Sequence, residues 1–206
     1  DVAPSRGLGD VYKRQVMDGK KHTAIASLAP DVFCVSMNGL SKSHRICGFR
    51  VGWMVLSGPK KNVKGYIEGL NMLANMRLCA NVLSQHVIQT SLGGYQSVDE
   101  LLIPGGRIYE QREFITNTVN AIPGLSAVKP DAGLYIFPRI DRNMYDIEDD
   151  EEFCLRLLKK EKVLLVPGKG FNWNEPDHFR IVYLPRVEEL ADLGNKIERV
   201  LSYYKR

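Results

Sequence analysis

Lys42 and Arg50 are the two side chains of this sequence whose types and spacing best suit catalysis. Lys42 follows an apolar run at 32–35 and lies in a turn with glycine and serine, and Arg50 comes eight residues later, flanked by glycines. A neutral lysine amine can form a Schiff base with an aldehyde, and a guanidinium can bind a phosphate through two parallel hydrogen bonds. The pair suits a cofactor with both groups, although a solvated surface lysine in a glycine-rich turn is the plainer interpretation.

The composition is that of an ordinary globular protein of mixed charge. The 206 residues are 44% hydrophobic and 25% charged, and the formal net charge is +4. Basic residues are spread among acidic ones, so we expect no nucleic-acid partner. No apolar run approaches the roughly 20 residues that cross a bilayer, and the start does not resemble a signal peptide. We therefore expect no membrane partner.

The cysteines and histidines predict no metal site. The four cysteines lie far apart without CxxC spacing, and the four histidines show no metal-ligand spacing. We expect buried, reduced thiols in a cytoplasmic protein that binds no metal.

The hydrophobic pattern predicts an α/β chain. The continuous apolar run at 32–37 is typical of a strand buried on both faces, as in a parallel sheet, and a second strand is expected at 51–56. Helical spacing predicts helices at 60–78, 82–92, 107–121 and 150–160, and a last helix that starts after Pro185 and runs to Tyr204. Short strands are expected at 125–128, 134–138, 163–166 and 179–184.

The chain is predicted to contain two domains. The proline and glycine at 123–124 mark a boundary, so residues 16–123 form one domain and residues 124–206 a smaller one. Residues 1–15 are polar, lack either hydrophobic period and resemble translated sequence at the edge of an incomplete gene. We predict that they are an artefact or a disordered extension, and we leave them out of the fold.

Residues 39–52, GLSKSHRICGFRVG, closely resemble the lysine signature of the class I/II (fold-type I) pyridoxal-phosphate aminotransferases. In that family an arginine also follows the lysine after eight residues. Arg45 stands where the family usually has a small residue, and this is similar to the bacterial alanine-transaminase branch. The resemblance extends over nearly all of residues 16–206 and includes the segments IPGGR (103–107), FNW (171–173) and PDHFRIV (176–182).

The resemblance implies a fold, an activity and partners. Residues 16–123 would be the C-terminal part of the large, mixed or parallel-sheet cofactor domain, and residues 124–206 the small α/β C-terminal domain. The implied reaction is transamination between L-alanine and 2-oxoglutarate, giving pyruvate and L-glutamate, in a homodimer that binds pyridoxal 5'-phosphate. Aspartate or aromatic transamination, a C–S lyase and a non-catalytic effector-binding regulator domain stay open as alternatives of the same fold.

The resemblance also assigns roles to single residues. Lys42 resembles the lysine that forms the internal aldimine and moves the proton between the substrate α-carbon and the cofactor. Arg50 resembles the ligand of the cofactor phosphate, and Ser41 adds a hydroxyl to it, whereas Gly39 stands where many relatives have a further serine. Arg180 resembles the arginine that binds the substrate α-carboxylate through a planar fork.

Part of the implied site lies upstream of this chain. Tyr12 is in register with a cofactor-contacting tyrosine of the family, but Gly9 stands where the family has an aspartate. The aspartate that pairs with the pyridine nitrogen is expected before Val16, because that pairing lets the ring act as an electron sink. We therefore expect this chain to be a C-terminal half with little activity alone.

Overall fold

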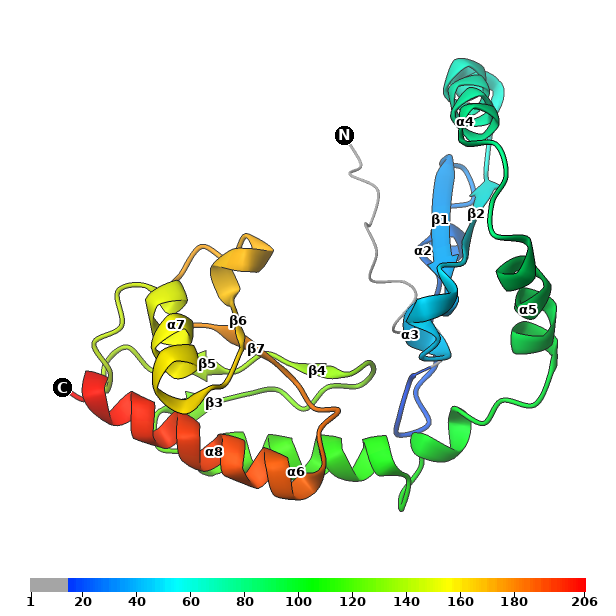
Figure 1. The fold of residues 1–206 in the computed structure, drawn as a ribbon. Helices are drawn as coiled ribbons and strands as arrows, with labels where there is room; N and C mark the ends of the chain where they lie inside the picture. Colours follow the sequence, from blue (N-terminus) through cyan, green and yellow to red (C-terminus); the bar gives the residue numbers. More distant parts are fainter. Residues whose placement is uncertain (1–14) are drawn as a thin grey trace. The chain divides into compact units, whose positions relative to one another are not determined.

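The structure, a computed structural model, describes residues 15–206 and divides them into two compact units between Glu100 and Leu101 (Figure 1). The predicted domain boundary at 123–124 falls inside the second unit. The second unit begins earlier because helix α6 (Arg107–Ala121) packs against helix α8 (Val187–Leu201). The domain limits of the whole protein stay a prediction.

The first unit is built on one antiparallel strand pair. Strand β1 (Cys34–Gly39) pairs with β2 (Gly52–Ser57). Both predicted strands are therefore present, and within the described residues they pair antiparallel with each other. The parallel sheet expected from the apolar run at 32–37 is not formed by this pair. The side chain of Met37 is 60% exposed, since this sheet has only two strands within the described chain. A continuous apolar run does not distinguish the two kinds of pairing.

Helices α4 and α5 of the first unit follow the predicted ranges 60–78 and 82–92, whereas the short helices outside those ranges were not predicted. The structure has α2 (Ile25–Leu28), α3 (Leu40–Ser43), η1 (Cys47–Phe49), η2 (Lys61–Val63), α4 (Lys64–Arg77), α5 (Val82–Gly93) and η3 (Asp99–Leu101). Helix α5 begins after Asn81, whose side chain accepts a hydrogen bond from the backbone N–H of Ser84 at 3.2 Å. This cap satisfies one of the free N–H groups of the first turn.

Two small antiparallel sheets lie with three helices in the second unit (Figure 1). One sheet has the order β4 (Tyr135–Ile136), β7 (Phe179–Val182) and β6 (Val166–Pro167), and the other pairs β3 (Leu125–Ser126) with β5 (Arg139–Ile140). The remaining elements are α7 (Asp150–Glu161), η4 (Gly168–Phe171) and η5 (Ser202–Tyr204). Helices α6 and α8 run side by side along the strands (Figure 1).

The core of the second unit follows from the hydrophobic periodicity of its helices. Helix α8 buries Leu190, Ile197 and Val200, which recur on one face. Each fully buried side chain of this size contributes about 1.5–3 kcal/mol.

The cysteines differ in part from the prediction. All four are free, but Cys47 and Cys79 are exposed, and only Cys154 is buried. Burial, with a smaller contribution from the carboxylate of Asp150, raises the pKa of the Cys154 thiol to about 12. That thiol is therefore neutral and unreactive at ordinary pH.

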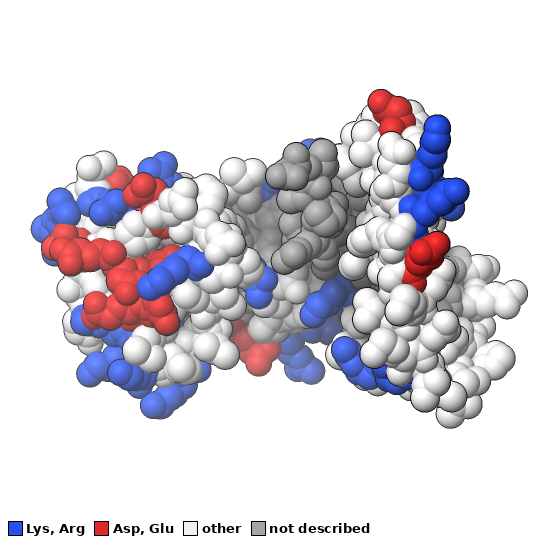
Figure 2. All heavy atoms as spheres, turned by 90° about the horizontal axis from the view of Figure 1, so that it is seen from above, with Lys and Arg blue, Asp and Glu red and all other residues white. Residues whose placement is uncertain are grey.

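Charged side chains of both signs share the surface of the second unit. On the face shown in Figure 2, Lys and Arg side chains lie next to Asp and Glu side chains. Arg199 on α8 pairs with Glu161 at the end of α7 at 2.7 Å. No helix among the described residues combines the length and the apolar character needed to cross a membrane.

Gly124 is expected to be essential for the stability of the second unit. It has a φ of +75°, and a Cβ there would lie 2.5 Å from the ring of buried Tyr145. Gly105, with a φ of +86° and nothing within 4 Å of such a Cβ, is a matched control. We expect Gly124→Ala to lower the free energy of unfolding by about 1–3 kcal/mol more than Gly105→Ala does, because only the first adds a clash to the backbone strain. Urea unfolding measures the difference, and equal losses would contradict the packing described here.

Candidate functional site

The strand pairing of the first unit places Lys42 and Arg50 in one loop. Gly39 at the end of β1 lies opposite Gly52 at the start of β2, so the residues between them form a connection tied at both ends. A Cβ at position 52 would lie 2.7 Å from the backbone oxygen of Asn38. Only glycine permits this close approach of the two strands.

Lys42 lies in the single helical turn α3 rather than in a glycine turn. Its side chain is exposed, and it makes no ion pair or side-chain hydrogen bond with any residue of the described chain. Ser41 is half-buried beside it. The backbone oxygen of Lys42 accepts a hydrogen bond of 3.0 Å from the side chain of Gln15, which is fully buried. Gln15 therefore belongs to the fold, although we had grouped it with the extension at 1–15.

Polar contacts fix the turn that carries Lys42. The hydroxyl of Ser43 donates to the backbone oxygen of Gly39 at 3.1 Å and lies 3.0 Å from Nδ1 of His44. The other ring nitrogen of His44, Nε2, lies 2.8 Å from the backbone oxygen of Ser91 on α5, so Nε2 carries the proton that this bond requires. Helix α3 is thus tied to β1 and to α5.

Arg50 adopts a left-handed backbone conformation with φ 52° and ψ 46°. This region is uncommon for residues other than glycine and costs on the order of 1 kcal/mol. The exposed guanidinium donates from Nη1 to the backbone oxygen of Cys47 at 2.8 Å, which leaves its other N–H groups available. Such strain often occurs where a side chain is held for binding.

The loop fits a phosphate-bearing aldehyde. Neither Lys42 nor Arg50 forms an ion pair with a carboxylate of residues 15–206. One loop therefore offers an amine, a guanidinium and, from Ser41, a hydroxyl. The guanidinium and the hydroxyl can donate hydrogen bonds to an anionic phosphate, and the amine in its neutral form is a nucleophile for an aldehyde carbon.

Arg180 lies on strand β7 of the second unit, beside two aromatic rings. Its Cζ is 4.5 Å from the ring centroids of both Tyr135 on β4 and Phe171 on η4. Its Nε is buried and has no hydrogen-bond partner in the described chain. An unpaired buried donor costs about 1–3 kcal/mol, so this guanidinium is suited to an acceptor from outside the chain, such as a carboxylate.

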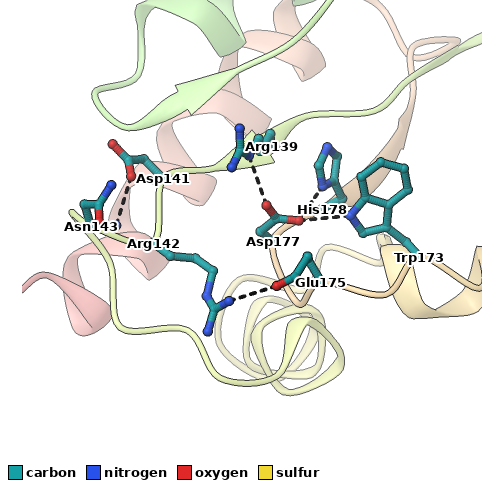
Figure 3. Close-up of polar contacts among 8 residues, drawn as sticks. All are labelled: Arg139, Asp141, Arg142, Asn143, Trp173, Glu175, Asp177 and His178. Carbon is teal, nitrogen blue, oxygen red and sulfur yellow. Dashed lines mark hydrogen bonds and ion pairs between the residues drawn. The ribbon is translucent and has the colours of Figure 1, made fainter.

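A buried carboxylate organises the segment next to Arg180 (Figure 3). Asp177 is 4% exposed. One oxygen, Oδ1, accepts from Nδ1 of His178 at 2.6 Å and from Nε1 of Trp173 at 3.0 Å, and the other, Oδ2, accepts from Nε of Arg139 at 3.0 Å. Burial alone would raise the pKa of Asp177, but the hydrogen bonds from His178, Trp173 and Arg139 outweigh it and lower the pKa.

The structure places the predicted site residues in two groups and leaves one out. Lys42, Ser41 and Arg50 share the loop of the first unit, and Arg180 lies in the second. Tyr12 lies outside the described residues. Within residues 15–206, no three His, Cys, Asp or Glu side chains are grouped to hold a metal ion.

Sequence reasoning did not assign the residues around Arg180. Phe171, Trp173, Asp177 and His178 all lie in the segments at 171–173 and 176–182, whose resemblance we noted without giving the side chains a role. Three aromatic or imidazole rings and two carboxylates, those of Glu175 and Asp177, within eight residues were the available signal.

The α/β fold, the loop that carries Lys42 and the arginine on β7 are features expected of a class I/II aminotransferase. The comparison with known families identifies the same class. Residues 9–197 match the family described as aminotransferase class I and II, and the chain belongs to that family. The match includes residues 9–15 of the segment that we predicted to be an extension.

The chain is similar to alanine aminotransferases over part of their length. It is 56% identical over 195 residues to "Glutamate-pyruvate aminotransferase AlaA" of Escherichia coli K12, covering 95% of this chain and 48% of the relative. It is 48% identical over 196 residues to "Alanine aminotransferase" of Mycobacterium tuberculosis H37Rv, covering 95% and 46%. The chain thus spans about half the length of the curated relatives it matches.

Solved structures confirm the predicted α/β fold of fold-type I aminotransferases. An aminotransferase from Escherichia coli superposes with a TM-score of 0.92 at 55% identity, covering 96% of this chain and 49% of that one. An alanine aminotransferase from Pyrococcus furiosus gives a TM-score of 0.83 at 33% identity, covering 94% and 48%.

Asp177 is expected to make the stability of the second unit depend on acid pH. Because its pKa is lower when folded, it stabilises the protein above the unfolded carboxyl pKa of about 3.9, and this contribution disappears as the pH falls through the folded value. Asp177→Asn should lower the free energy of unfolding by about 2 kcal/mol at pH 7 and weaken its fall in acid.

Urea unfolding at several pH values between 7 and 3 measures both effects. Glu175→Gln is the control, because Glu175 forms an exposed ion pair with Arg142 in the same region (Figure 3) and such pairs contribute about 0–1 kcal/mol. If Asp177→Asn had the same free energy of unfolding as wild type both at pH 7 and in acid, the stabilising role of Asp177 would be contradicted.

Proposed function

We propose that this chain is the C-terminal half of a pyridoxal-phosphate-dependent aminotransferase that exchanges the amino group of L-alanine with 2-oxoglutarate. The proposal depends mainly on one observation: Lys42 and Arg50 lie in the same loop, and neither forms an ion pair with a carboxylate of the described residues. The identity of 56% to the Escherichia coli relative named for glutamate and pyruvate supports the choice of substrates. Identity to an aspartate aminotransferase of Geobacillus stearothermophilus is lower, at 30%.

Each candidate residue has a distinct task. Lys42, Arg50 and Ser41 would hold pyridoxal 5'-phosphate, Arg50 and Ser41 at the phosphate. When bound, the cofactor supplies an aldehyde and a ring that stabilises negative charge at the substrate α-carbon. The Lys42 amine, once free, would move the proton from that α-carbon to the former aldehyde carbon of the cofactor, and in the opposite direction in the reverse half-reaction. Arg180 would bind the carboxylate of the amino acid and so fix the orientation of the substrate.

We also propose that the whole protein is a homodimer, as its family implies. Helix α4 buries none of its residues, and its Leu73 and Met76 are 63% and 75% exposed. On α5, Leu83 is 81% exposed. Large apolar side chains exposed on these two consecutive helices are typical of surfaces covered by other protein. The cytoplasmic location expected from the cysteines stays a prediction.

Alternative activities differ in substrate. Aspartate or aromatic transamination and a C–S lyase use the same lysine, so the amino-donor preference of the whole protein separates them from alanine transamination. A non-catalytic regulator domain would need neither Lys42 nor Arg180, and both are present.

Lys42→Ala in the whole protein is expected to abolish the visible absorbance band of lysine-bound cofactor. Transamination should fall by about a thousandfold, because both the covalent attachment and the base are lost. Absorbance spectra and a pyruvate-coupled assay measure the two effects. Lys61→Ala, at an exposed lysine outside the loop, is the control and should match wild type. Persistence of the band in Lys42→Ala would refute the lysine assignment.

The chain of 206 residues alone is expected to show no appreciable transamination. It spans about half the length of its relatives, and the aspartate that pairs with the pyridine nitrogen is expected upstream. Alanine-dependent formation of glutamate is measured with added cofactor and 2-oxoglutarate, with the whole protein as the positive control. Comparable turnover by the two would show that no upstream residue is needed.

A further inference from the structure

Phe171 reaches Arg180 from outside the sheet. Arg180 and Tyr135 lie on neighbouring strands, β7 and β4, so their contact follows from strand pairing. Phe171 instead ends the short helix η4, and the following residue, Asn172, has a left-handed φ of 58°. The place of the Phe171 ring on the guanidinium therefore depends on whatever fixes the turn at 168–173.

Backbone contacts anchor the start of this turn. The N–H of Gly168 donates to the backbone oxygen of His178 at 2.8 Å, and the N–H of Lys169 donates to the carboxylate of Asp150 at 3.0 Å. A Cβ at position 168 would meet both His178 and Asp150 at about 3 Å, so the turn lies directly against them. These contacts hold residues 168 and 169, but they do not fix the ring at 171.

A series of ring contacts fixes Phe171. Its ring packs edge-on against Phe137 at 6.0 Å, and Phe137 stacks on His178 at 4.8 Å with 26° between the planes. Trp173 lies 5.8 Å from Phe137 and 4.4 Å from His178. Asp177 binds the N–H groups of both Trp173 and His178 (Figure 3), so it sets the orientation of the two rings that support Phe137.

We propose that Asp177, Trp173 and His178 are positioning residues that hold the Phe171 ring on the guanidinium of Arg180 and so set the affinity for the substrate carboxylate. The inference rests on the proposed role of Arg180. A ring on the face of a guanidinium is attracted to its charge, and it limits rotation of the fork, so that less entropy is lost when a carboxylate binds at the N–H edge.

The first experiment compares substitutions at position 171 in the whole protein. Phe171→Leu should raise the KM for L-alanine about tenfold, because the fork is no longer ordered by a ring before the carboxylate binds. The effect on kcat should be smaller, because the lost affinity is shared by the bound ground state and the transition state. Phe171→Tyr keeps the ring and should stay within about twofold of wild type. Trp173→Phe, which keeps a ring but loses the N–H that Asp177 binds, should raise KM by roughly threefold.

A binding measurement without turnover accompanies the kinetics. Sodium propionate, a carboxylate without an amine, should raise the Tm of wild type by mass action on the folded state. The shift should be smaller in Phe171→Leu and absent in Arg180→Met. Arg142→Gln is the control, because the Arg142 side chain bonds only Glu175 within the part that the structure describes (Figure 3), and it should match wild type in both measurements.

The outcomes separate the inference from the function on which it rests. A wild type that neither transaminates nor responds to propionate would overturn the proposed role of Arg180. An active wild type with the same KM and the same propionate shift in Phe171→Leu would overturn the positioning role alone. If Phe171→Leu does not fold, the Trp173→Phe variant tests the inference instead. An unchanged KM in Trp173→Phe would overturn the inference, and a raised KM with unchanged kcat would support it.

Discussion

The carboxylate of Asp177 is the constraint on which the second unit's candidate site depends. Three donors converge on its two oxygens, and two of them, from Arg139 on β5 and Trp173 after η4, hold those segments to the residues that precede β7. Hydrogen bonds to a charged acceptor are about twice as strong as neutral ones, and burial removes competing water. A buried charge is tolerated there only because every donor is in place. Asp177 therefore orders the segment around Arg180 without contacting Arg180 itself.

The two groups of candidate residues share an electrostatic principle. Some surface cations elsewhere in the described chain pair with carboxylates, as Arg199 does with Glu161 and Arg206 with Asp146. Lys42, Arg50 and Arg180 have no such partner among residues 15–206. Backbone oxygens and aromatic rings hold Arg50 and Arg180 instead, and these neighbours orient a cation without neutralising it. A full positive charge is thus kept for an anion from outside the chain.

The sequence predicted long elements and family motifs better than short elements and contacts. Helix α6 has the predicted bounds because its periodic residues end just before a proline and a glycine. Strand β5 was missed, since two residues cannot show a period. The Lys42 and Arg50 spacing was recognised from a signature that is local in sequence. The buried contact from Gln15 to Lys42 joins residues far apart along the chain, and no local pattern indicates it.

The two units position their functional groups by different physical means. Buried apolar side chains are abundant in the second unit, whereas among residues 15–100 they are Met17, Leu40 and Val98. A small apolar core gives little packing energy to resist displacement of a loop. The loop of Lys42 instead depends on directional polar contacts from Gln15, Ser43 and His44. Hydrogen bonds fix orientation more strictly than apolar contacts do, so the geometry of this lysine is set by a few polar side chains outside any large core.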